Sequence, residues 1–243
     1  MPVLLVAGGS RGIGAATARL AAKQGYDIAV NYNANAQAAA AVLKDIEASG
    51  RRAVAIKGDM GKEADIERVF DETAKALGPV THVVHSSGIT GSSSRLDEAS
   101  AETIRAAFEV NSIGALLCLR AAIRRMSTKH GGKGGAIVML SSMAATLGSA
   151  GEYIWYAASK GAVDTMVVGA AREVVREGIR INAVSPGMID TDIHPPGRLD
   201  RFTPMIPAGR AGKAEEVAEA ILYLLSDRAS YIVGANLRVS GGR

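Results

Sequence analysis

The chain has a single cysteine, Cys118, so a disulfide within it is impossible. Cys118 lies in an apolar run and is predicted to be a core residue. No apolar run is long enough to cross a bilayer, and no basic leader or cleavage site precedes the first predicted strand. We therefore expect a soluble, cytoplasmic protein with no membrane partner.

An excess of charge of one sign is also lacking. The net charge is only +4, and the basic residues are spread along the chain, which does not indicate a nucleic-acid partner. The one local basic cluster is Arg124, Arg125, Lys129 and Lys133. It is interpreted as a helix C-terminus, where cations favour the dipole. The alternative is a docking site for an acidic carrier protein or a phosphorylated substrate.

Aromatic residues make up only 4% of the chain, whereas Ala, Val, Ile and Leu supply most of its apolar content. This composition is typical of buried parallel strands covered by close-packed helices. Strand-like and helix-like segments alternate, which predicts right-handed crossovers. The predicted strands are Pro2–Ala7, Asp27–Tyr32, Arg52–Lys57, Thr81–Ser86, Gly134–Ser141, Ile179–Ser185 and Ile232–Val239. The predicted helices are Gly12–Gln24, Asn35–Ser49, Glu63–Leu77, Ala101–Thr128, Glu152–Arg176 and Ala214–Ser226.

No repeat, coiled coil or linker interrupts this alternation, so we predict one domain over residues 1–243. The least regular segment is Ile189–Gly212, which is polar and punctuated by proline and glycine. It is interpreted either as a mobile lid over a pocket or as an ordinary surface excursion, and the sequence does not separate the two.

Tyr156 and Lys160 are four residues apart in a predicted helix, so their side chains share one face. A free tyrosine titrates near ~10, too high for acid–base catalysis at neutral pH. A cation at ~4 Å contributes about 4 kcal/mol at an effective dielectric of ~20, enough to lower that pKa by about 3 units. We therefore predict that Lys160 makes Tyr156 a proton donor and acceptor. The alternative is a solvated helix face.

A glycine-rich loop, residues 8–14, follows the first predicted strand and opens the first helix. Glycines let the backbone approach a ligand closely, and free N–H groups at a helix start favour phosphate. The loop lacks the Gly-Lys-Ser/Thr of a Walker loop. Thr17 stands where a G-x-G-x-x-G fingerprint beginning at Gly12 needs glycine.

A hydrolase is an alternative interpretation of this loop. Gly8-x-Ser10-x-Gly12 matches the nucleophile elbow of serine hydrolases in its strand–turn–helix context. An elbow on the first strand has no preceding strands from which to build an oxyanion loop, which argues against it. Its candidate partners are His194 with Asp164, Asp190 or Asp192. The four histidines have no metal-ligand spacing, so no metal is expected.

Three motifs occur in an order that resembles one family. They are Gly8-x-x-x-Gly12-x-Gly14, a serine before Tyr156-x-x-x-Lys160, and Pro186-Gly187 after a late strand. In this order and spacing the chain resembles the short-chain dehydrogenase/reductase family over almost its whole length, especially 3-oxoacyl-carrier-protein reductases and glucose 1-dehydrogenase-like members. The resemblance implies a single-domain, α/β, Rossmann-like doubly wound parallel sheet of seven strands in the order 3-2-1-4-5-6-7. It also implies a nicotinamide cofactor and hydride transfer to or from a carbonyl carbon.

The resemblance implies a catalytic set of four residues. Ser142 would hold the substrate oxygen, and Tyr156 would protonate it. Lys160 would lower the pKa of Tyr156 and bind the nicotinamide ribose, while Asn111 would keep a water relay to Lys160. From the residues alone, Ser141 rivals Ser142, and Asn111 is a solvated or capping residue.

The resemblance also implies cofactor contacts. Asp59 would accept a hydrogen bond from the adenine amine, although an Asx turn before Gly61 explains this residue nearly as well. Thr191 and the backbone of Ile189 would contact the nicotinamide carboxamide. The expected cofactor-binding residues are Gly8, Ser10, Arg11, Gly12, Ile13, Gly14, Asn31, Tyr32, Asp59, Met60, Ser86, Gly88, Tyr156, Lys160, Pro186, Gly187, Ile189 and Thr191.

Three features depart from the family pattern. His85-Ser86-Ser87-Gly88 replaces Asn-Asn-Ala-Gly, which puts the hydrogen bonds of the asparagines in doubt, and His85 is interpreted as structural. Ser142 precedes Tyr156 by one residue more than usual, which places an extra residue in Gly148–Trp155. Ser240 replaces an aspartate near an end of the chain that usually lies at a subunit interface.

The turn after the second predicted strand, residues 30–35, has no acid. A carboxylate there would bind the ribose 2′-hydroxyl of NAD and repel a 2′-phosphate. Arg11 could pair with that phosphate. We therefore predict NADP(H), with NAD possible. The resemblance also implies a homotetramer that pairs the helices Ala101–Thr128 and Glu152–Arg176.

These expectations describe an NADP(H)-dependent oxidoreductase that acts on a carbonyl or secondary alcohol, such as a 3-oxoacyl thioester, a sugar or a small ketone. The alternative is a non-catalytic NADP-binding sensor or scaffold, which the altered His85–Ser87 segment keeps open. The substrate is not readable, because Ser92–Arg95, Gly148–Trp155 and His194–Met205 carry no specific charge pattern.

Overall fold

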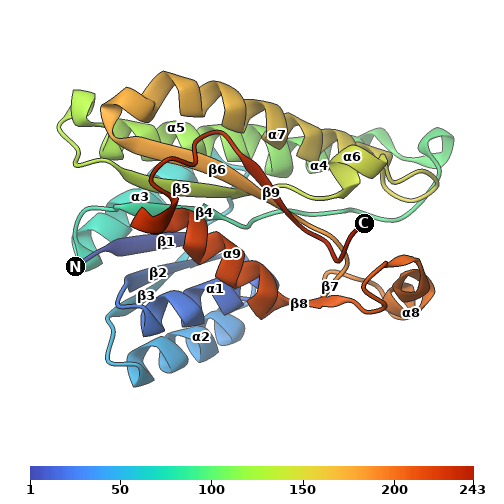
Figure 1. Cartoon of the computed structure of the whole chain (residues 1–243), viewed down its shortest axis with the longest axis horizontal. Coiled ribbons are helices and arrows are strands. Elements are labelled where there is room, and N and C mark those ends of the chain that lie inside the picture. Colours follow the sequence, from blue (N-terminus) through green and yellow to red (C-terminus); the bar gives the residue numbers. More distant parts are fainter.

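The computed structural model describes Met1 to Arg243 and places a parallel sheet between two layers of helices (Figure 1). The strand order is β3-β2-β1-β4-β5-β6-β9, which confirms the predicted order of the seven strands. The order reverses between β1 and β4, so the carboxyl ends of these strands flank a crevice. The strands are β1 (Val3–Ala7), β2 (Asp27–Tyr32), β3 (Ala53–Lys57), β4 (His82–His85), β5 (Gly135–Leu140), β6 (Ile179–Pro186) and β9 (Asn236–Val239).

Helices α1, α2 and α9 cover one face of the sheet, and α3, α4, α5 and α7 cover the other (Figure 1). A short helix, α6, follows β5, and another, α8, lies in the excursion after β6. The helices are α1 (Gly12–Lys23), α2 (Ala36–Ala48), α3 (Glu63–Leu77), α4 (Ala101–Phe108), α5 (Gly114–Met126), α6 (Ala144–Leu147), α7 (Ile154–Val174), α8 (Arg198–Phe202) and α9 (Ala214–Leu225).

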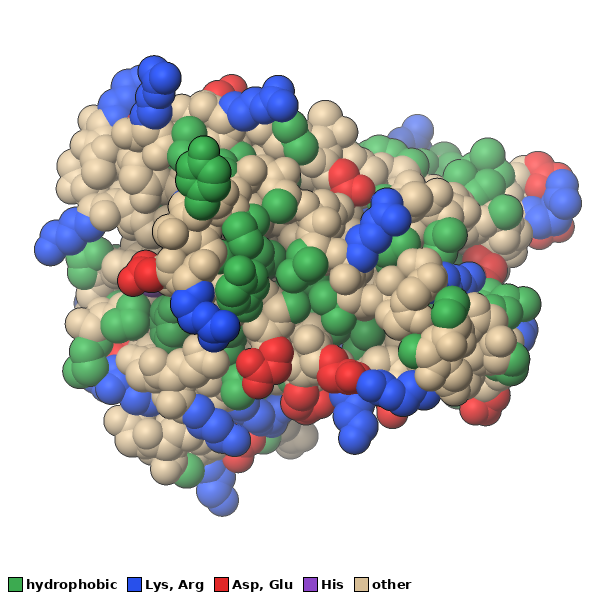
Figure 2. Space-filling model, in the orientation of Figure 1, with side chains coloured by type: hydrophobic (Ala, Val, Ile, Leu, Met, Phe, Trp, Pro, Cys, Tyr) green, Lys and Arg blue, Asp and Glu red, His purple; other side chains and the backbone are tan.

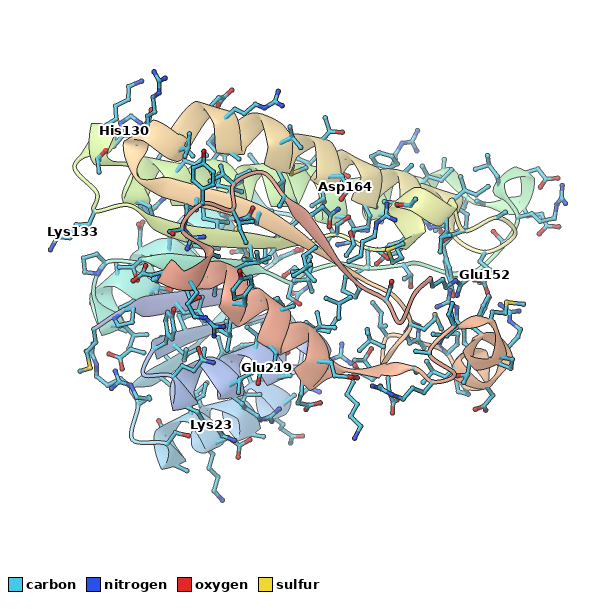
Figure 3. All side chains as sticks on the ribbon, viewed as in Figure 1. Lys23, His130, Lys133, Glu152, Asp164 and Glu219 are labelled. Atoms are coloured by element: carbon cyan, nitrogen blue, oxygen red, sulfur yellow. The ribbon has the colours of Figure 1, made fainter.

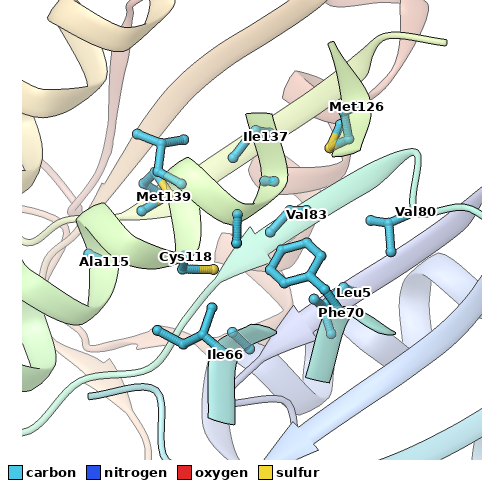
Figure 4. Close-up of a cluster of buried hydrophobic side chains, with 14 of the residues drawn as sticks. Leu5, Ile66, Phe70, Val80, Val83, Ala115, Cys118, Met126, Ile137 and Met139 are labelled. Carbon is cyan, nitrogen blue, oxygen red and sulfur yellow. The ribbon is translucent and has the colours of Figure 1, made fainter. Parts of the chain in front are cut away.

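The two faces of β1 belong to two separate cores. Leu5 joins a cluster of 27 buried residues on one face of the sheet, whereas Leu4 and Val6 join a cluster of 24 on the other. This division follows from the two-residue period of a strand. Figure 4 shows part of the first cluster, where Leu5 lies with Phe70 and Cys118. Cys118 is thus a core residue as predicted, and burial raises the pKa of its thiol to about 12.

The predicted helix Ala101–Thr128 is not continuous. A turn of π-helix, η2 (Glu109–Ile113), separates α4 from α5. Asn111 lies in this turn, and its side chain makes hydrogen bonds outside the helix. Gly114 begins α5 so close to the carbonyl of Met60 that a side chain would not fit, which fixes the path of the helix after the turn.

The combined helix Ala101–Met126 is the one segment with the length and apolar composition of a membrane span, with a mean hydropathy of 1.5 in its most apolar window. This corrects the expectation that no segment is long enough. Half of that window is buried within the protein. Residues of α5 such as Ala115, Cys118 and Ala122 pack in the first core cluster.

The last strand and α7 are shorter than predicted, and α5 ends two residues before the predicted Thr128, while the other boundaries agree within one residue. The predicted strand Ile232–Val239 begins only at Asn236. Gly234 has a φ of 72°, and the side chain of Asn182 bonds to both Ile232 and Ala235, so the chain bends before the strand starts. The predicted helix Glu152–Arg176 runs from Ile154 to Val174.

The irregular segment Ile189–Gly212 has a defined base. A two-residue strand, β7 (Ile189–Asp190), pairs in parallel with β8 (Gly212–Lys213), so the ends of the excursion lie side by side. Between them lie α8 and a short helix, η5 (Thr203–Met205), which project at the edge of the molecule (Figure 1).

Candidate active site

A large cleft of about 790 Å³ opens at the carboxyl ends of the strands, where the strand order reverses. Open α/β sheets bind ligands at this position. The walls come from the glycine loop, the turns after β2 and β4, the end of β5, the start of α7 and the excursion after β6. The structure brings the predicted site residues together on these walls, except Gly14 and Asn111, which do not line the cleft.

The glycine loop forms a cradle at one end of the cleft. A side chain on Gly14 would overlap the carbonyl oxygen of Gly8, so α1 can pack this closely only with glycine there. Gly12 begins α1 with a φ of 51°, and no side chain caps the helix N-terminus. The first amide groups of α1 are therefore available to a ligand, and the helix dipole favours negative charge. The residues present fit the phosphates of a dinucleotide.

Two predicted cofactor residues use their side chains within the protein. The Asn31 carboxamide accepts a hydrogen bond from the Gly8 amide at 3.1 Å and donates to the Gly58 carbonyl at 2.9 Å, which joins the ends of β1, β2 and β3. Asp59 accepts from the Gly61 amide at 2.9 Å, which is the geometry of the Asx-turn alternative. Both residues still line the cleft.

The hydroxyl groups of Ser142 and Tyr156 meet in the middle of the cleft. Ser142 follows β5, and its oxygen accepts a hydrogen bond from the Ala144 amide at 3.1 Å. The Ser142 side chain also lies close enough to the Tyr156 hydroxyl to lower the pKa of that phenol. The rival serine, Ser141, instead donates to the backbone carbonyl of Lys160 at 3.2 Å. Of the two serines, Ser142 is therefore the one positioned beside the phenol.

Lys160 lies one helical turn beyond Tyr156, but its position differs from the predicted one. Its Nζ donates to the Leu140 carbonyl at 2.7 Å and lies 5.9 Å from the centre of the Tyr156 ring. Burial lowers the pKa of Lys160 to about 8, while Asp164 opposes that shift.

Burial also raises the pKa of Tyr156, and the hydrogen bond from Ser142 and the charge of Arg198 lower it by less. The predicted lowering of the pKa of Tyr156 by Lys160 is therefore wrong for this state of the protein. The reason is that desolvation of a buried phenol outweighs the nearby charges, and the ammonium group is turned toward a carbonyl.

Asn111 holds together three segments behind the cleft. Its Oδ1 accepts from the Ile89 amide, and its Nδ2 donates to the Ile89 carbonyl and to Ser159 Oγ, at 2.8–3.0 Å. A side chain on Gly88 would lie 3.2 Å from Asn111 Oδ1 and 3.4 Å from Lys160 Nζ. The glycine thus lets the chain after β4 pass directly over the asparagine and the lysine.

His85 is fully buried, and neither ring nitrogen has a hydrogen-bond partner. Burial and the charge of Lys160 lower its pKa to about 3, so the ring is neutral. The backbone after it remains anchored, because the Ser86 amide donates to the Ala7 carbonyl at 2.9 Å. No group of three or more His, Cys, Asp or Glu side chains is placed to hold a metal.

Arg11 and Asp192 form an ion pair of 2.6 Å across the mouth of the cleft, and both side chains are more than half exposed. This pair links the glycine loop to the excursion after β6. Thr191 lies beside Gly12, at 3.4 Å from the position a Cβ would take there. Arg11 is therefore placed at the cradle, but its guanidinium already has an anionic partner.

The end of the chain packs beside the cleft. A side chain on Gly187 would collide with Ser240, so Pro186-Gly187 and the last residues pass in close contact. Arg243 lines the cleft, and its guanidinium lies 5.2 Å from the centre of the Phe202 ring. The close passage of Ser240 explains why glycine follows Pro186 at the end of β6. From the sequence alone, Pro186-Gly187 was only a family motif.

The end of the cleft opposite the glycine cradle is called the far end. Sequence reasoning missed the residues there and found no charge pattern in the segments that form it. The structure corrects this, because Arg198 and Arg201 of α8 both pair with Glu152, with a distance of 2.8 Å to Arg198. Figure 3 shows Glu152 beside the segment that carries α8. The cleft at this end is also lined by Tyr153, His194, Phe202 and Arg243. The arginines themselves were the available signal, since two of them lie one turn apart in the irregular segment.

The structure argues against the hydrolase alternative from the sequence, and it shows part of the basic cluster paired. No hydrogen bond joins Ser10 to a histidine, and His194 Nδ1 lies 2.9 Å from Arg198 Nη1, so no hydrolase triad forms. Arg125 of the basic cluster pairs with Glu67 and Asp71 of α3 at 2.8 and 2.6 Å. Basic and acidic side chains are also interspersed on the face shown in Figure 2.

Comparisons with known proteins agree with this geometry. A family model described as enoyl-(acyl carrier protein) reductase matches residues 7–243. The chain is 45% identical to an uncharacterized oxidoreductase, YgfF, of Escherichia coli K12, over 100% of both chains. It is 37% identical to the 3-oxoacyl-[acyl-carrier-protein] reductase of Rattus norvegicus, over 99% of this chain and 97% of the relative. It is 38% identical to the L-rhamnose 1-dehydrogenase (NAD(P)(+)) of a Sphingomonas species, over 98% and 94%.

Among solved structures, a short-chain dehydrogenase of Burkholderia cenocepacia J2315 in complex with NADP superimposes with a TM-score of 0.92. The two are 35% identical over 99% of this chain and 97% of that chain. The chain therefore belongs to the short-chain dehydrogenase/reductase family, and it is an oxidoreductase that acts on CH–OH groups with a nicotinamide cofactor.

Proposed function

We propose that the protein reduces a carbonyl substrate with NADPH, or oxidises the corresponding secondary alcohol with NADP. The observation that carries this proposal is the meeting of the Ser142 and Tyr156 hydroxyl groups in a cleft that also contains the glycine cradle and Lys160. When bound, the coenzyme supplies the hydride. Every other requirement of the reaction, namely orientation of the carbonyl, delivery of a proton and its replacement, falls to the side chains of this chain.

The roles follow from position. Ser142 holds the substrate oxygen, and the adjacent Tyr156 hydroxyl gives it a proton in reduction or takes one in oxidation. Lys160 is buried behind the tyrosine and binds the nicotinamide ribose, and its lowered pKa lets it exchange a proton near neutral pH. Asn111 is a positioning residue, because its hydrogen bonds to Ile89 fix the π-turn against the segment after β4. We propose that a water relay to Lys160 runs beside it.

NADP is the proposed coenzyme. The part of the cleft wall formed by Asn31, Tyr32 and Asn35 carries no carboxylate that would repel a 2′-phosphate, and Arg11 lies at the cradle. Asp192 holds Arg11 in this structure, so we propose that the phosphate displaces the carboxylate as the guanidinium's partner. NAD is the weaker alternative.

We further propose one domain whose residues 189–212 act as a lid over the cleft, since β7 and β8 give the excursion a two-strand hinge. A homotetramer in the cytoplasm is the proposed state. Its support is that Ile113 of η2, Leu116 of α5 and Val168 of α7 are exposed apolar residues. The relatives named above act on a 3-oxoacyl thioester and on a sugar, and both classes contain the carbonyl or secondary alcohol that this cleft would take.

The test is NADPH consumption with a panel of ketones, keto acids, 3-oxoacyl thioesters and sugar lactones, with Tyr156→Phe as the matched variant. We expect kcat to fall about 100- to 10,000-fold in this variant while coenzyme affinity changes by less than about threefold, because only the proton donor is removed. Tight NADPH binding with no turnover of any carbonyl or alcohol would instead favour the sensor or scaffold.

A further inference from the structure

The far end of the cleft contains charged side chains that hydride and proton transfer do not require. Glu152, Arg198 and Arg243 line this end, together with the rings of Tyr153 and Phe202. They come from three segments far apart in the sequence, namely the loop before α7, α8 and the end of the chain. Such a convergence of charge in a partly apolar wall indicates recognition of a charged ligand.

The guanidinium of Arg198 is fixed on four sides. Its Nη2 donates to Glu152 at 2.8 Å, and its Nη1 donates to His194 Nδ1 at 2.9 Å. The ring centres of Tyr153 and Phe202 lie 5.2 and 5.1 Å from its Cζ. The side chain is only 16% exposed. A cation held in this way is preorganised, so a ligand that binds it does not have to order a flexible side chain.

Part of the hydrogen-bonding capacity of Arg198 is unused. A guanidinium has five N–H donors, and those of Arg198 reach Glu152, His194 and, at 3.8 Å, Met188 Sδ, while Nε is buried without any partner. A buried donor without an acceptor is unfavourable, so an additional acceptor oxygen near the Arg198 guanidinium would stabilise this site.

Charge at this end is also unbalanced. Arg198, Arg201 and Arg243 all lie within 5.2 Å of the Phe202 ring centre, whereas Glu152 is the one carboxylate side chain that pairs with any of them. Of the other two acids on the cleft wall, Asp192 is paired with Arg11, and Asp59 accepts from the Gly61 amide in the turn after β3. The arginines therefore exceed the available carboxylates.

We propose that the far end of the cleft binds a carboxylate group of the substrate through Arg198, so that the substrate is a keto acid in reduction or a hydroxy acid in oxidation. This inference rests on the proposed function and adds the substrate class. A planar monoanion matches the planar guanidinium, and the aromatic walls strengthen the attraction by excluding water. Tyr156 and Arg198 line the same cleft, so the anionic group would lie on the substrate's side away from the coenzyme cradle.

The experiment compares matched pairs of keto acids and their amides, from 3-oxobutanoate to 5-oxohexanoate, with NADPH as the coenzyme. We expect kcat/KM for at least one acid to exceed that of its amide by about tenfold or more. Arg198→Gln should lower this acid/amide ratio by about 10- to 100-fold. Arg201→Gln is the control, because it removes a guanidinium with the same Glu152 partner from the same helix but does not line the cleft.

A second readout does not depend on turnover. Trp155 is the single tryptophan, and it packs with Tyr153 beside the proposed site. Its fluorescence should report tighter binding of the acid than of the amide to the protein saturated with NADP, and Arg198→Gln should remove the difference. Turnover of ketones without any acid preference, or equal loss of preference in Arg198→Gln and Arg201→Gln, would overturn the carboxylate site alone. Lack of all turnover would count against the proposed function, while the fluorescence titration would still decide the carboxylate site.

Discussion

The two ends of the cleft are built in different ways. We call the end with the glycine cradle the coenzyme end, and the far end with Glu152, Arg198 and Arg243 the substrate end. At the coenzyme end, the backbone approaches closely at glycines, and short polar side chains such as Asn31 and Asn111 bond to backbone groups. At the substrate end, long charged side chains bond to one another across distant segments, as in the pairing of Arg198 and Arg201 with Glu152. The structure of the coenzyme end depends on close backbone packing at glycines, whereas that of the substrate end depends on ion pairs between charged side chains.

This difference matters for what each end can tolerate. A glycine that faces a carbonyl leaves no room for any side chain, so the coenzyme end is fixed by local sequence. A guanidinium that pairs with a carboxylate can be rearranged when either partner changes, so the substrate end can differ between relatives that share a fold. We therefore propose that the local sequence at the coenzyme end defines the family, whereas the charged residues at the other end determine which substrate binds.

The largest effect should follow a change of space at the coenzyme end. Gly14→Ala places a methyl group against the carbonyl oxygen of Gly8, and backbone atoms cannot move aside as a side chain can. We expect a loss of about 3 kcal/mol or more in the free energy of unfolding, together with a loss of coenzyme binding, measured by denaturant titration and NADPH fluorescence.

Gly161→Ala is the matched control for Gly14→Ala. No atom lies within 4 Å of the added methyl group in α7, so this variant should gain up to about 1 kcal/mol through helix propensity. Similar stability of the two variants would mean that close packing does not define the coenzyme end.

The next effect tests charge at the coenzyme end. Arg11→Gln should weaken NADP binding about 10- to 100-fold and NAD binding by less than about threefold, because only NADP carries the 2′-phosphate. Isothermal titration of both coenzymes measures this. Arg19→Gln, which breaks an exposed pair between α1 and Asp45 of α2, is the control and should leave both affinities unchanged. Equal losses for the two coenzymes with Arg11→Gln would contradict the NADP assignment.

The sequence predicted the sheet and the coenzyme end for the same physical reason. The buried strands and the glycine loop are local patterns, so β1 to α1 could be read from consecutive residues. The break at η2 could not, because it depends on hydrogen bonds from Asn111 to Ile89 and Ser159, which lie far away in the sequence. Spacing placed Tyr156 and Lys160 on one helix face, but it could not show that Lys160 turns toward Leu140 or that burial dominates the pKa of Tyr156.

The substrate end was unreadable for a related reason. Glu152, Arg198 and Arg243 belong to segments without any shared local pattern, and only the folded chain brings them to one wall. Arg198 could not be singled out from the sequence, because it lies in an irregular segment where an arginine is ordinarily expected to be on the surface.

His85 is the exception at the coenzyme end, since its ring has no partner at all. Its pKa is about 3 in the folded protein and near ~6.5 when unfolded, so between these values the unfolded chain binds a proton that the folded chain does not. Stability therefore falls as the pH falls through this window, by about 1.4 kcal/mol per pH unit from this residue. We expect His85→Leu to flatten the pH dependence of stability by that amount between about pH 6 and 4, measured by urea titration.

His82 provides the comparison within the same strand. Its pKa is also lowered by burial, to about 4, but Nδ1 is hydrogen-bonded to Thr81 Oγ1 at 2.8 Å and the ring packs edge-on against Tyr26. His82→Leu should flatten the same pH dependence but lower stability at pH 7, because it removes the hydrogen bond to Thr81. His85→Leu should keep or raise stability at pH 7, because the ring of His85 makes no hydrogen bond that the substitution would remove. A larger loss at pH 7 for His85→Leu would show that its nitrogens are satisfied in solution.

The smallest effect tests the ion pair that links the two ends. Asp192 competes with a bound phosphate for Arg11, and an exposed pair of this kind contributes no more than about 1 kcal/mol. Asp192→Asn should therefore tighten NADP binding by about two- to fivefold, with a smaller gain for NAD because removing a negative charge at the mouth favours any anionic coenzyme. The gain should shrink as salt is raised from low to about 0.5 M, since exposed charges are screened over a few ångströms. Weaker NADP binding in this variant would mean that Asp192 holds Arg11 in its productive position rather than competing for it, and the two ends of the cleft would then act as one coupled unit.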